Sequence, residues 1–249
     1  MTLENWVTMY QQINSTNAKN KNTNGSKPYA GPIFYCEDLS VQFGEIRALK
    51  NIQLTIERGE IIFVTGASGA GKSTLLKLLS GHQEPTHGKI IRPNEMSGKK
   101  NLYISNVFQD LRLMGKYTCE ENLLFAYDSS IYKDKNEFVQ DMNELTRILG
   151  IRDRLHLKIN VANGGLQQKV AIIRSLLTRP DVLVADEPTS SLDTDNARRL
   201  FDVFNLYNSK RGLTVVWATH NKELIKSFTG RILHLDNGRL VYSGSACSI

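Results

Sequence analysis

The stretch "GASGAGKST", residues 66–74, fits the pattern G-x-x-x-x-G-K-[ST] in full. In such a loop, glycines let main-chain N–H groups turn inward and cradle phosphate oxygens, at the N-terminus of a helix whose dipole favours anions. Lys72 is predicted to reach the outer phosphates of a nucleotide, and the Ser73 hydroxyl to ligate Mg²⁺. The loop is expected to comprise Gly66, Ala67, Ser68, Gly69, Ala70, Gly71, Lys72, Ser73 and Thr74.

The segments on either side give this loop the context that it needs. Before it, "GEIIFVTG" (59–66) is a short apolar run bounded by glycines, which is typical of a buried central strand. After it, "KSTLLKLLSG" (72–81) has helical spacing and a glycine stop at Gly81. A strand, a loop and a helix therefore follow one another, as phosphate binding requires.

Two adjacent acids end a second apolar strand, in "LVADEPTSSLD" (183–193). Asp186 is predicted to hold Mg²⁺ opposite the phosphate loop. Glu187 stands next to it, where a general base could polarise an attacking water. The alternative for such a pair, taken alone, is a solvated loop, but the phosphate loop favours the functional interpretation.

His220 and Gln109 are each expected to end a strand, in "TVVWATH" (214–220) and "SNVFQD" (105–110). A lone histidine is more often structural. At the C-terminal edge of an open α/β sheet, however, where ligands collect, His220 could hydrogen-bond a γ-phosphate. Gln109 is expected at the same edge and means little by itself.

The order of patterns indicates an α/β core with an all-helical insert at about 111–179. Within the insert, Thr118 and Glu121 have the spacing of a capping box. Near the C-terminus, residues 231–244 read as a hairpin with its turn at 236–238. We expect a disordered polar leader over 1–30, one domain over 31–245 and a tail over 246–249.

Composition restricts the class of protein. The chain has 249 residues, 41% of them hydrophobic, and its longest apolar runs are far shorter than the roughly 20 residues that span a bilayer. Cys36, Cys119 and Cys247 are odd in number and widely spaced, which predicts a reducing compartment. The net charge of +6 is mostly diffuse, without a basic helix carrying interleaved aromatics, so no nucleic-acid partner is expected; a solvated surface or weak attraction to an anionic membrane are the alternatives.

These motifs, in this order, resemble the ATP-binding cassette (ABC) ATPases across residues 33 to about 243. The resemblance implies a P-loop NTPase fold of ABC type, with a mixed sheet core, an antiparallel β subdomain and a helical subdomain. It makes "LVADE" the Walker B strand, "SLD" (191–193) the D-loop, His220 the switch histidine and Gln109 the Q-loop residue, which contacts Mg²⁺. Phe43 in "VQF" occupies the place of the aromatic residue that stacks on adenine.

The stretch "VANGGLQQKV" (161–170) lies where this family carries its signature, L-S-G-G-[QE]. In the family, this helix of one subunit points its N-terminus at the γ-phosphate held by the other. Gly164 and Gly165 are retained, but Asn163 replaces serine and Leu166 replaces Gln or Glu. Because Asn caps helices as well as Ser and its amide can donate, we expect an ATP clamp with slower turnover. The competing hypothesis is a site that binds ATP without hydrolysing it.

The resemblance further implies a homodimeric ATPase that uses ATP and Mg²⁺ and works with an integral membrane subunit. The stretches "FVTGASGAGKSTLLKLLSG" (63–81) and "FQDLRLM" (108–114) most resemble the FtsE branch of the family, which acts in bacterial cell division with the membrane protein FtsX. An FtsX-like permease is therefore the expected partner, contacted near Gln109 and "DLRLMGK" (110–116), at the cytoplasmic face of the bacterial inner membrane. The alternatives are a transporter of the lipoprotein or macrolide-export type, and a nucleotide-binding regulatory module with little turnover.

Overall fold

A computed structural model describes residues 32–92 and 102–245. The predicted leader and tail lie outside these residues. The described strands form two sheets, one of three strands and one of six. The strands are β1 (Pro32–Phe43), β2 (Ile46–Glu57), β3 (Ile61–Thr65), β4 (His87–Ile91), β5 (Ile104–Val107), β6 (Val182–Asp186), β7 (Thr214–Ala218), β8 (Arg231–Asp236) and β9 (Arg239–Ser245).

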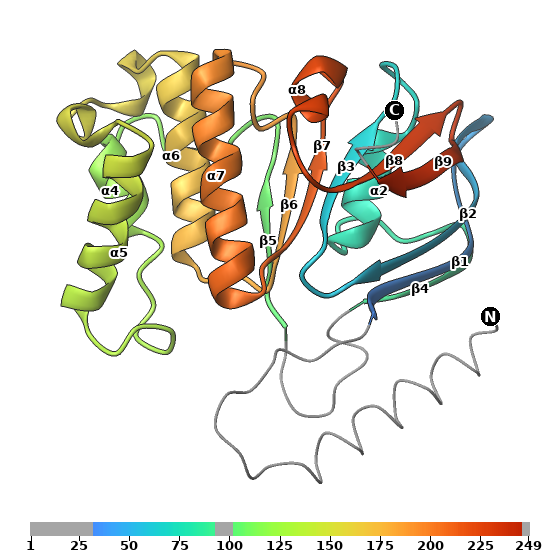
Figure 1. The fold of residues 1–249 in the computed structure, drawn as a ribbon, viewed down its shortest axis with the longest axis horizontal. Coiled ribbons are helices and arrows are strands. Elements are labelled where there is room, and N and C mark those ends of the chain that lie inside the picture. Colours follow the sequence, from blue (N-terminus) through green and yellow to red (C-terminus); the bar gives the residue numbers. More distant parts are fainter. Residues whose placement is uncertain (1–31, 93–101, 246–249) are drawn as a thin grey trace, which may run out of the picture.

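The six-stranded sheet has the order β5-β6-β7-β3-β8-β9 and is mixed, as expected. Its first five strands are parallel, and only β9 runs antiparallel, against β8. Every residue of β3 and β7 is buried. Helix α7 (Thr194–Arg211) covers one face of these strands, and helix α2 (Lys72–Leu79) with the three-stranded sheet covers the other. This burial explains why both strands are continuous apolar runs rather than alternating ones. The carboxyl ends of β3, β5, β6 and β7 meet at one edge (Figure 1).

The antiparallel subdomain is the sheet β2-β1-β4. Along β2, Ile52, Leu54 and Ile56 are buried while Gln53 and Thr55 between them are less so, as expected for a strand with one face on the core. Helix α2 (Lys72–Leu79) contacts β2 as well as β6 and β7, so it fills the space between the two sheets. A single apolar core therefore joins the phosphate-loop helix to both sheets.

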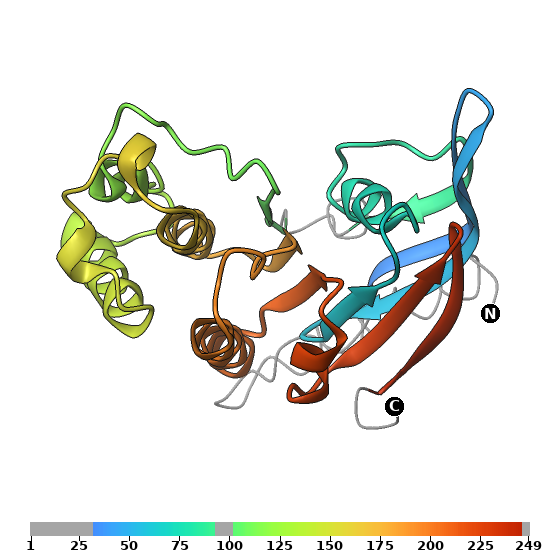
Figure 2. The ribbon, with the colours of Figure 1, turned by 90° about the horizontal axis from the view of Figure 1, so that it is seen from above.

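The helices between residues 111 and 179 gather at the end of the molecule away from the antiparallel sheet (Figure 2). The predicted capping box is confirmed: Glu121 N donates to Thr118 Oγ1 (3.1 Å), and Thr118 N donates to Glu121 Oε2 (2.7 Å). Within 32–92 and 102–245, no helix combines the length and the apolar character needed to cross a membrane. The remaining helices are α4 (Cys119–Leu124), α5 (Lys135–Ile148), η1 (Arg152–Arg154), η2 (Ile159–Val161), α6 (Gly164–Leu177), α7 (Thr194–Arg211) and α8 (Lys222–Lys226).

The hairpin of β8 and β9 turns at Asn237 and Gly238, both with positive φ (47° and 78°), as a two-residue hairpin loop requires. This turn also braces the phosphate loop. Gly238 N donates to Ala70 O (3.1 Å), and Lys50 N donates to Gly238 O (2.8 Å). The hairpin that the sequence predicted thus connects the phosphate loop to β2.

An ionic cluster around Arg179 joins the helical subdomain to the core. Arg179 follows α6, and its Nη2 donates to Glu137 Oε1 and Asp141 Oδ2 of α5, both at 2.8 Å. Its guanidinium carbon lies 4.0 Å from the centre of the Tyr132 ring. Arg211, in the last turn of α7, reaches the same Asp141 oxygen at 3.4 Å. The cluster therefore fixes α5 against the ends of α6 and α7.

Replacing Arg179 with methionine is expected to lower the free energy of unfolding by about 1–3 kcal/mol, because charged partners lose their hydrogen bonds. The hydrogen bond from Arg179 is the main cause that lowers the pKa of Glu137 below its ordinary value of 4.5. Because the pKa of Glu137 is lower in the folded than in the unfolded protein, the contribution of its bond with Arg179 to stability is present above pH 4.5. That contribution is lost as the pH falls through the folded pKa.

Urea titrations of the parent and the Arg179→Met variant should therefore differ most near pH 7 and converge in acid. Arg147→Met is the matched control, since Arg147 is an exposed arginine of the same subdomain. A variant as stable as the parent at pH 7 would contradict the role given to this cluster.

Candidate functional site

A cleft of about 590 Å³ opens at the carboxyl edge of the six-stranded sheet. It is bounded by the phosphate loop, the start of β2 and the residues that follow β5, β6 and β7. The cleft therefore brings together side chains from four separate motifs of the sequence. The predicted site residues that line it are Ser68, Gly69, Gly71, Lys72, Ser73, Thr74, Gln109, Asp186, Glu187 and His220.

The phosphate loop is held in shape by its own lysine. Lys72 Nζ donates to Gly66 O (2.8 Å) and to Ala67 O (3.0 Å), across the loop. Gly71 has φ 103°, and a Cβ there would lie 2.6 Å from Ala48 O, so only glycine fits. Gly66, Ala67 and Ala70 build the loop without lining the cleft.

Glu187 has an unusual main-chain conformation. Its φ of 52° lies in the left-handed region, which costs a non-glycine residue on the order of 1–3 kcal/mol and is concentrated at functional sites. Its N–H donates to Ala218 O at 2.9 Å, at the end of the neighbouring strand β7. The side chain is only 14% exposed. The sequence did not indicate this conformation, because nothing local distinguishes Glu187 from Asp186.

His220 lies against Glu187. Its Nδ1 is 2.9 Å from Glu187 Oε1, at hydrogen-bond distance, and in the tautomer with a proton on Nδ1 the ring donates to the carboxyl oxygen. Strand β7 ends at Ala218, so His220 lies two residues beyond the strand end rather than on it. Gln109 likewise lies two residues beyond the end of β5. Both residues nevertheless line the cleft, as predicted.

The donor set in the cleft suits a hard cation. Ser73, Gln109 and Asp186 contribute a hydroxyl, an amide and a carboxylate, and all three line the same cleft. Mg²⁺ prefers oxygen ligands, and in nucleotide sites it is usually held by one or two carboxylates together with substrate phosphates and water. The residues present therefore fit a magnesium–nucleotide complex.

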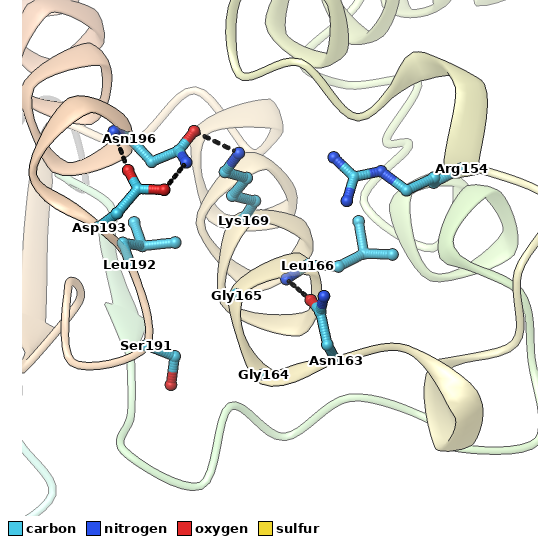
Figure 3. A pocket seen from close by; sticks show the side chains of 10 residues that line it. All are labelled: Arg154, Asn163, Gly164, Gly165, Leu166, Lys169, Ser191, Leu192, Asp193 and Asn196. Atoms are coloured by element: carbon cyan, nitrogen blue, oxygen red, sulfur yellow. Dashed lines mark hydrogen bonds between the residues drawn. The ribbon is translucent and has the colours of Figure 1, made fainter.

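The signature residues lie in a second pocket, of about 550 Å³ (Figure 3). Asn163 caps α6 as predicted, since its Oδ1 accepts from Leu166 N at 2.9 Å. Asn163, Gly164 and Gly165 line this pocket, and none of the described residues lines both pockets. Within one chain, the structure therefore does not bring the signature residues together with the phosphate loop.

Leu166 is 3% exposed and belongs to the core of the helical subdomain. At this position the family carries Gln or Glu. Here the leucine packs into that core and also lines the pocket, so an apolar side chain stands where the family has a polar one.

A chain of polar side chains links the signature helix to the D-loop. No pattern in the sequence indicates this link. Lys169 is 7% exposed, and its Nζ donates to Asn196 Oδ1 (2.6 Å); Asn196 Nδ2 in turn donates to Asp193 Oδ2 (2.8 Å) (Figure 3). Burial lowers the pKa of Lys169. A Cβ at Gly165 would lie 2.9 Å from Ser191 O, so α6 and the D-loop approach closely. The Asp-x-x-Asn spacing signals the cap of α7 but not its lysine partner.

Phe43 ends β1, opposite Ile46 on β2, and is half exposed. It does not line the cleft itself, but its register partner Ile46 does. The aromatic ring is therefore available near the cleft rather than inside it. Its stacking on adenine stays a prediction.

Comparison with known sequences identifies relatives along most of the chain. It is 33% identical over 214 residues to the methionine import ATP-binding protein MetN of Bacillus subtilis, covering 83% of this chain and 62% of MetN. It is 32% identical to the lipoprotein-releasing system ATP-binding protein LolD of Bacteroides fragilis, over 84% of this chain and all of LolD. It is 35% identical to the cell division ATP-binding protein FtsE of Bacillus subtilis, over 79% of this chain and 89% of FtsE. The chain thus spans less than two thirds of MetN.

Solved structures share the fold. The dimeric post-hydrolysis structure of the ATP-binding cassette MJ0796, bound to ADP and Pi, matches with a TM-score of 0.74 and 28% identity, covering 87% of this chain and all of that one. The sequence profile of the ABC transporter family matches residues 49–190, more than half of the chain, and these include the phosphate loop, the signature and Glu187. The expected ABC-type P-loop fold is therefore confirmed, and the chain belongs to the ABC transporter family.

Proposed function

We propose that this chain is the ATP-binding and ATP-hydrolysing subunit of a membrane ABC complex, acting in bacterial cell division with an FtsX-like membrane subunit. One observation carries the ATPase part: Lys72, Asp186 and Glu187 come from distant parts of the sequence and line a single cleft together with Ser73, Gln109 and His220. A cation for phosphate, oxygen ligands for Mg²⁺ and a carboxylate base are what phosphoryl transfer to water needs.

The roles of the residues are assigned from their places in the cleft. Lys72 and the loop N–H groups would bind phosphate oxygens, while Ser73, Gln109 and Asp186 would hold Mg²⁺. When bound, Mg²⁺ neutralises charge that develops on the phosphate oxygens. Glu187 orients the attacking water and accepts its proton, and His220 restrains the Glu187 carboxylate through the 2.9 Å hydrogen bond.

The separation of the two pockets supports a dimer. The signature pocket and the cleft are lined by different residues of one chain, so a complete site needs a second copy that presents its signature to the cleft. The similarity to a cassette solved as a dimer supports the same arrangement. Two ATP molecules would then lie between the phosphate loop of one subunit and the signature of its partner.

Restoring the signature serine should accelerate turnover. The Asn163 oxygen is engaged by Leu166 N, so its amide nitrogen is the group that can donate to phosphate. A donor to a developing negative charge is worth about 10²–10³ in rate, and asparagine recovers part of it. We therefore expect Asn163→Ser to raise kcat roughly tenfold. Steady-state phosphate release checks this, with equal melting temperatures as the control; a variant no faster than the parent would exclude the slow-site hypothesis.

Cell division is supported by the match that covers 89% of FtsE. Transport is the second candidate, and the match over the full length of LolD favours it. In the first case the membrane partner regulates cell-wall hydrolysis and carries no solute. In the second it moves a lipoprotein or another substrate. The identity of the membrane partner distinguishes these functions.

The test uses tagged Glu187→Gln protein expressed in its native cells, with membranes solubilised in Mg-ATP and co-purifying proteins identified by mass spectrometry. Recovery of an FtsX-like membrane protein with cell-wall or division proteins supports cell division. A permease with an export or substrate-binding component would replace that proposal with transport. The Lys72→Met variant is the control, because specific partners of the ATP-bound dimer should be depleted from it.

A further inference from the structure

The inference concerns Gln168, a buried amide in the second turn of α6. Gln168 is 3% exposed, and its side chain makes three hydrogen bonds, to Glu187, Ser190 and Ser191. Its Nε2 donates to Glu187 O (2.8 Å) and to Ser190 Oγ (3.1 Å). Its Oε1 accepts from Ser191 N (2.9 Å). One side chain of the signature helix therefore holds the segment that starts at Glu187 and enters the D-loop.

These bonds act on the main chain of Glu187, which is where its conformation is decided. The carbonyl oxygen of Glu187 accepts from Gln168 Nε2 and also from Ser190 N (3.1 Å). On the other side, Glu187 N donates to Ala218 O. A non-glycine residue stays in the left-handed region only where its surroundings impose that conformation. Gln168 supplies one of the three hydrogen bonds that impose it here.

The direction of the Glu187 side chain follows from its main chain. A change in φ and ψ at Glu187 would swing the carboxylate away from the position where His220 Nδ1 meets it at 2.9 Å. A general base must lie within hydrogen-bond reach of the water that it deprotonates. The hydrogen bonds to the main chain of Glu187 therefore also fix the position of its carboxylate.

We propose that Gln168 is a positioning residue, which holds Glu187 in its reactive conformation from the signature helix. The proposal rests on the proposed function, in which Glu187 is the general base. It adds a direct link between two ATP sites. Helix α6 begins beside Asn163, which serves the ATP of the partner, while Gln168 on the same helix fixes the base of its own chain. A displacement of α6 thus reaches Glu187 without passing through the sheet.

The test is Gln168→Met, which retains the length of the side chain and removes all three hydrogen bonds. A small misplacement of a reacting group costs about 10²-fold in rate, so we expect kcat to fall by about that factor. The phosphate loop is untouched, so the KM for ATP and the ATP dissociation constant should stay within about twofold of the parent. Gln168→Glu retains the acceptor for Ser191 N but, when ionised, has no N–H to donate to Glu187 O. A carboxylate oxygen then faces that carbonyl oxygen, so turnover should fall at least as far.

Asn208→Leu is the matched control. Asn208 Nδ2 also donates to two main-chain oxygens, those of Gly59 (2.6 Å) and Leu213 (2.8 Å), at the opposite end of the sheet. Its loss should lower the melting temperature while leaving kcat close to that of the parent. If Gln168→Met and Asn208→Leu reduce kcat equally, or if Gln168→Met keeps full turnover, the positioning role is wrong.

A double mutant separates this proposal from the function on which it rests. In the Glu187→Gln background, Gln168→Met should cause no further loss, because the two residues act as a unit. If Glu187→Gln itself turns over normally, the proposed role of Glu187 fails. If Glu187→Gln is inactive and Gln168→Met is not, only the role of Gln168 fails. Should Gln168→Met not fold, Gln168→Glu carries the same comparison.

Discussion

Glu187→Gln is expected to lower turnover by at least about 10²-fold while leaving a dimer with bound ATP. The amide has the shape of the carboxylate but cannot accept a proton, and general-base catalysis is worth about 10²–10⁴ in rate. Among the described residues that line the cleft, Asp186 is the only other carboxylate, and because it is the proposed metal ligand it cannot also serve as the base. Removing the negative charge also removes its repulsion of the phosphate, which favours the closed state.

Phosphate release and light scattering in Mg-ATP measure the two effects. The expected result is a kcat reduced by at least about 10²-fold and a mass twice that of the monomer. Glu144→Gln, which neutralises an exposed carboxylate on α5, is the control and should change neither quantity. A monomeric mass for Glu187→Gln in ATP would contradict the sandwich dimer, and a normal kcat would contradict the role of Glu187.

Lys72→Met is expected to weaken ATP binding and to stop hydrolysis. Each hydrogen bond from an ammonium to a charged partner contributes about 1.5–3 kcal/mol, so binding should weaken by about 10–100-fold. Lys72 also cross-links the loop through Gly66 O and Ala67 O, and its loss loosens the loop that presents the N–H donors. Turnover should fall by at least about 10²-fold, as for other donors to a developing charge.

Isothermal titration with ATP and phosphate release test this expectation. Lys77→Met is the matched control, because Lys77 is an exposed lysine on the same helix. It should bind ATP as the parent does. If Lys72→Met binds ATP with unchanged affinity, phosphate recognition depends on the main chain alone, and the role of the lysine has been misassigned.

The parts of the fold that could be predicted are those whose cause is local. The phosphate loop is contiguous, and its glycines, lysine and serine are needed at fixed spacing. The capping box at Thr118 joins residues three apart, and the hairpin turn needs the two residues with positive φ, Asn237 and Gly238. The apolar strands are recognisable because parallel sheets bury both faces.

What could not be predicted depends on contacts between distant residues. Glu187 owes its left-handed conformation to Ala218, Ser190 and Gln168, and two of these partners lie well outside its own loop. The partners of Arg179 are separated from it by about 40 residues along the chain. The burial of Leu166 is visible only once the helical subdomain is assembled around it. The site was recognisable as a set of motifs, whereas its internal restraints were not.

The brace between the hairpin and the phosphate loop has a consequence for synthesis of the chain. Gly238 donates a hydrogen bond to Ala70, and β8 pairs with β3. Both Gly238 and β8 leave the ribosome about 170 residues after the phosphate loop and β3. At ordinary rates of translation this delay is roughly 10–30 s. During that time the nascent chain carries the apolar segment "IIFVT" without its β7 and β8 neighbours. An unpaired apolar strand attracts other chains, so the nucleotide-binding end of this protein should be the part that most needs chaperone protection before translation ends.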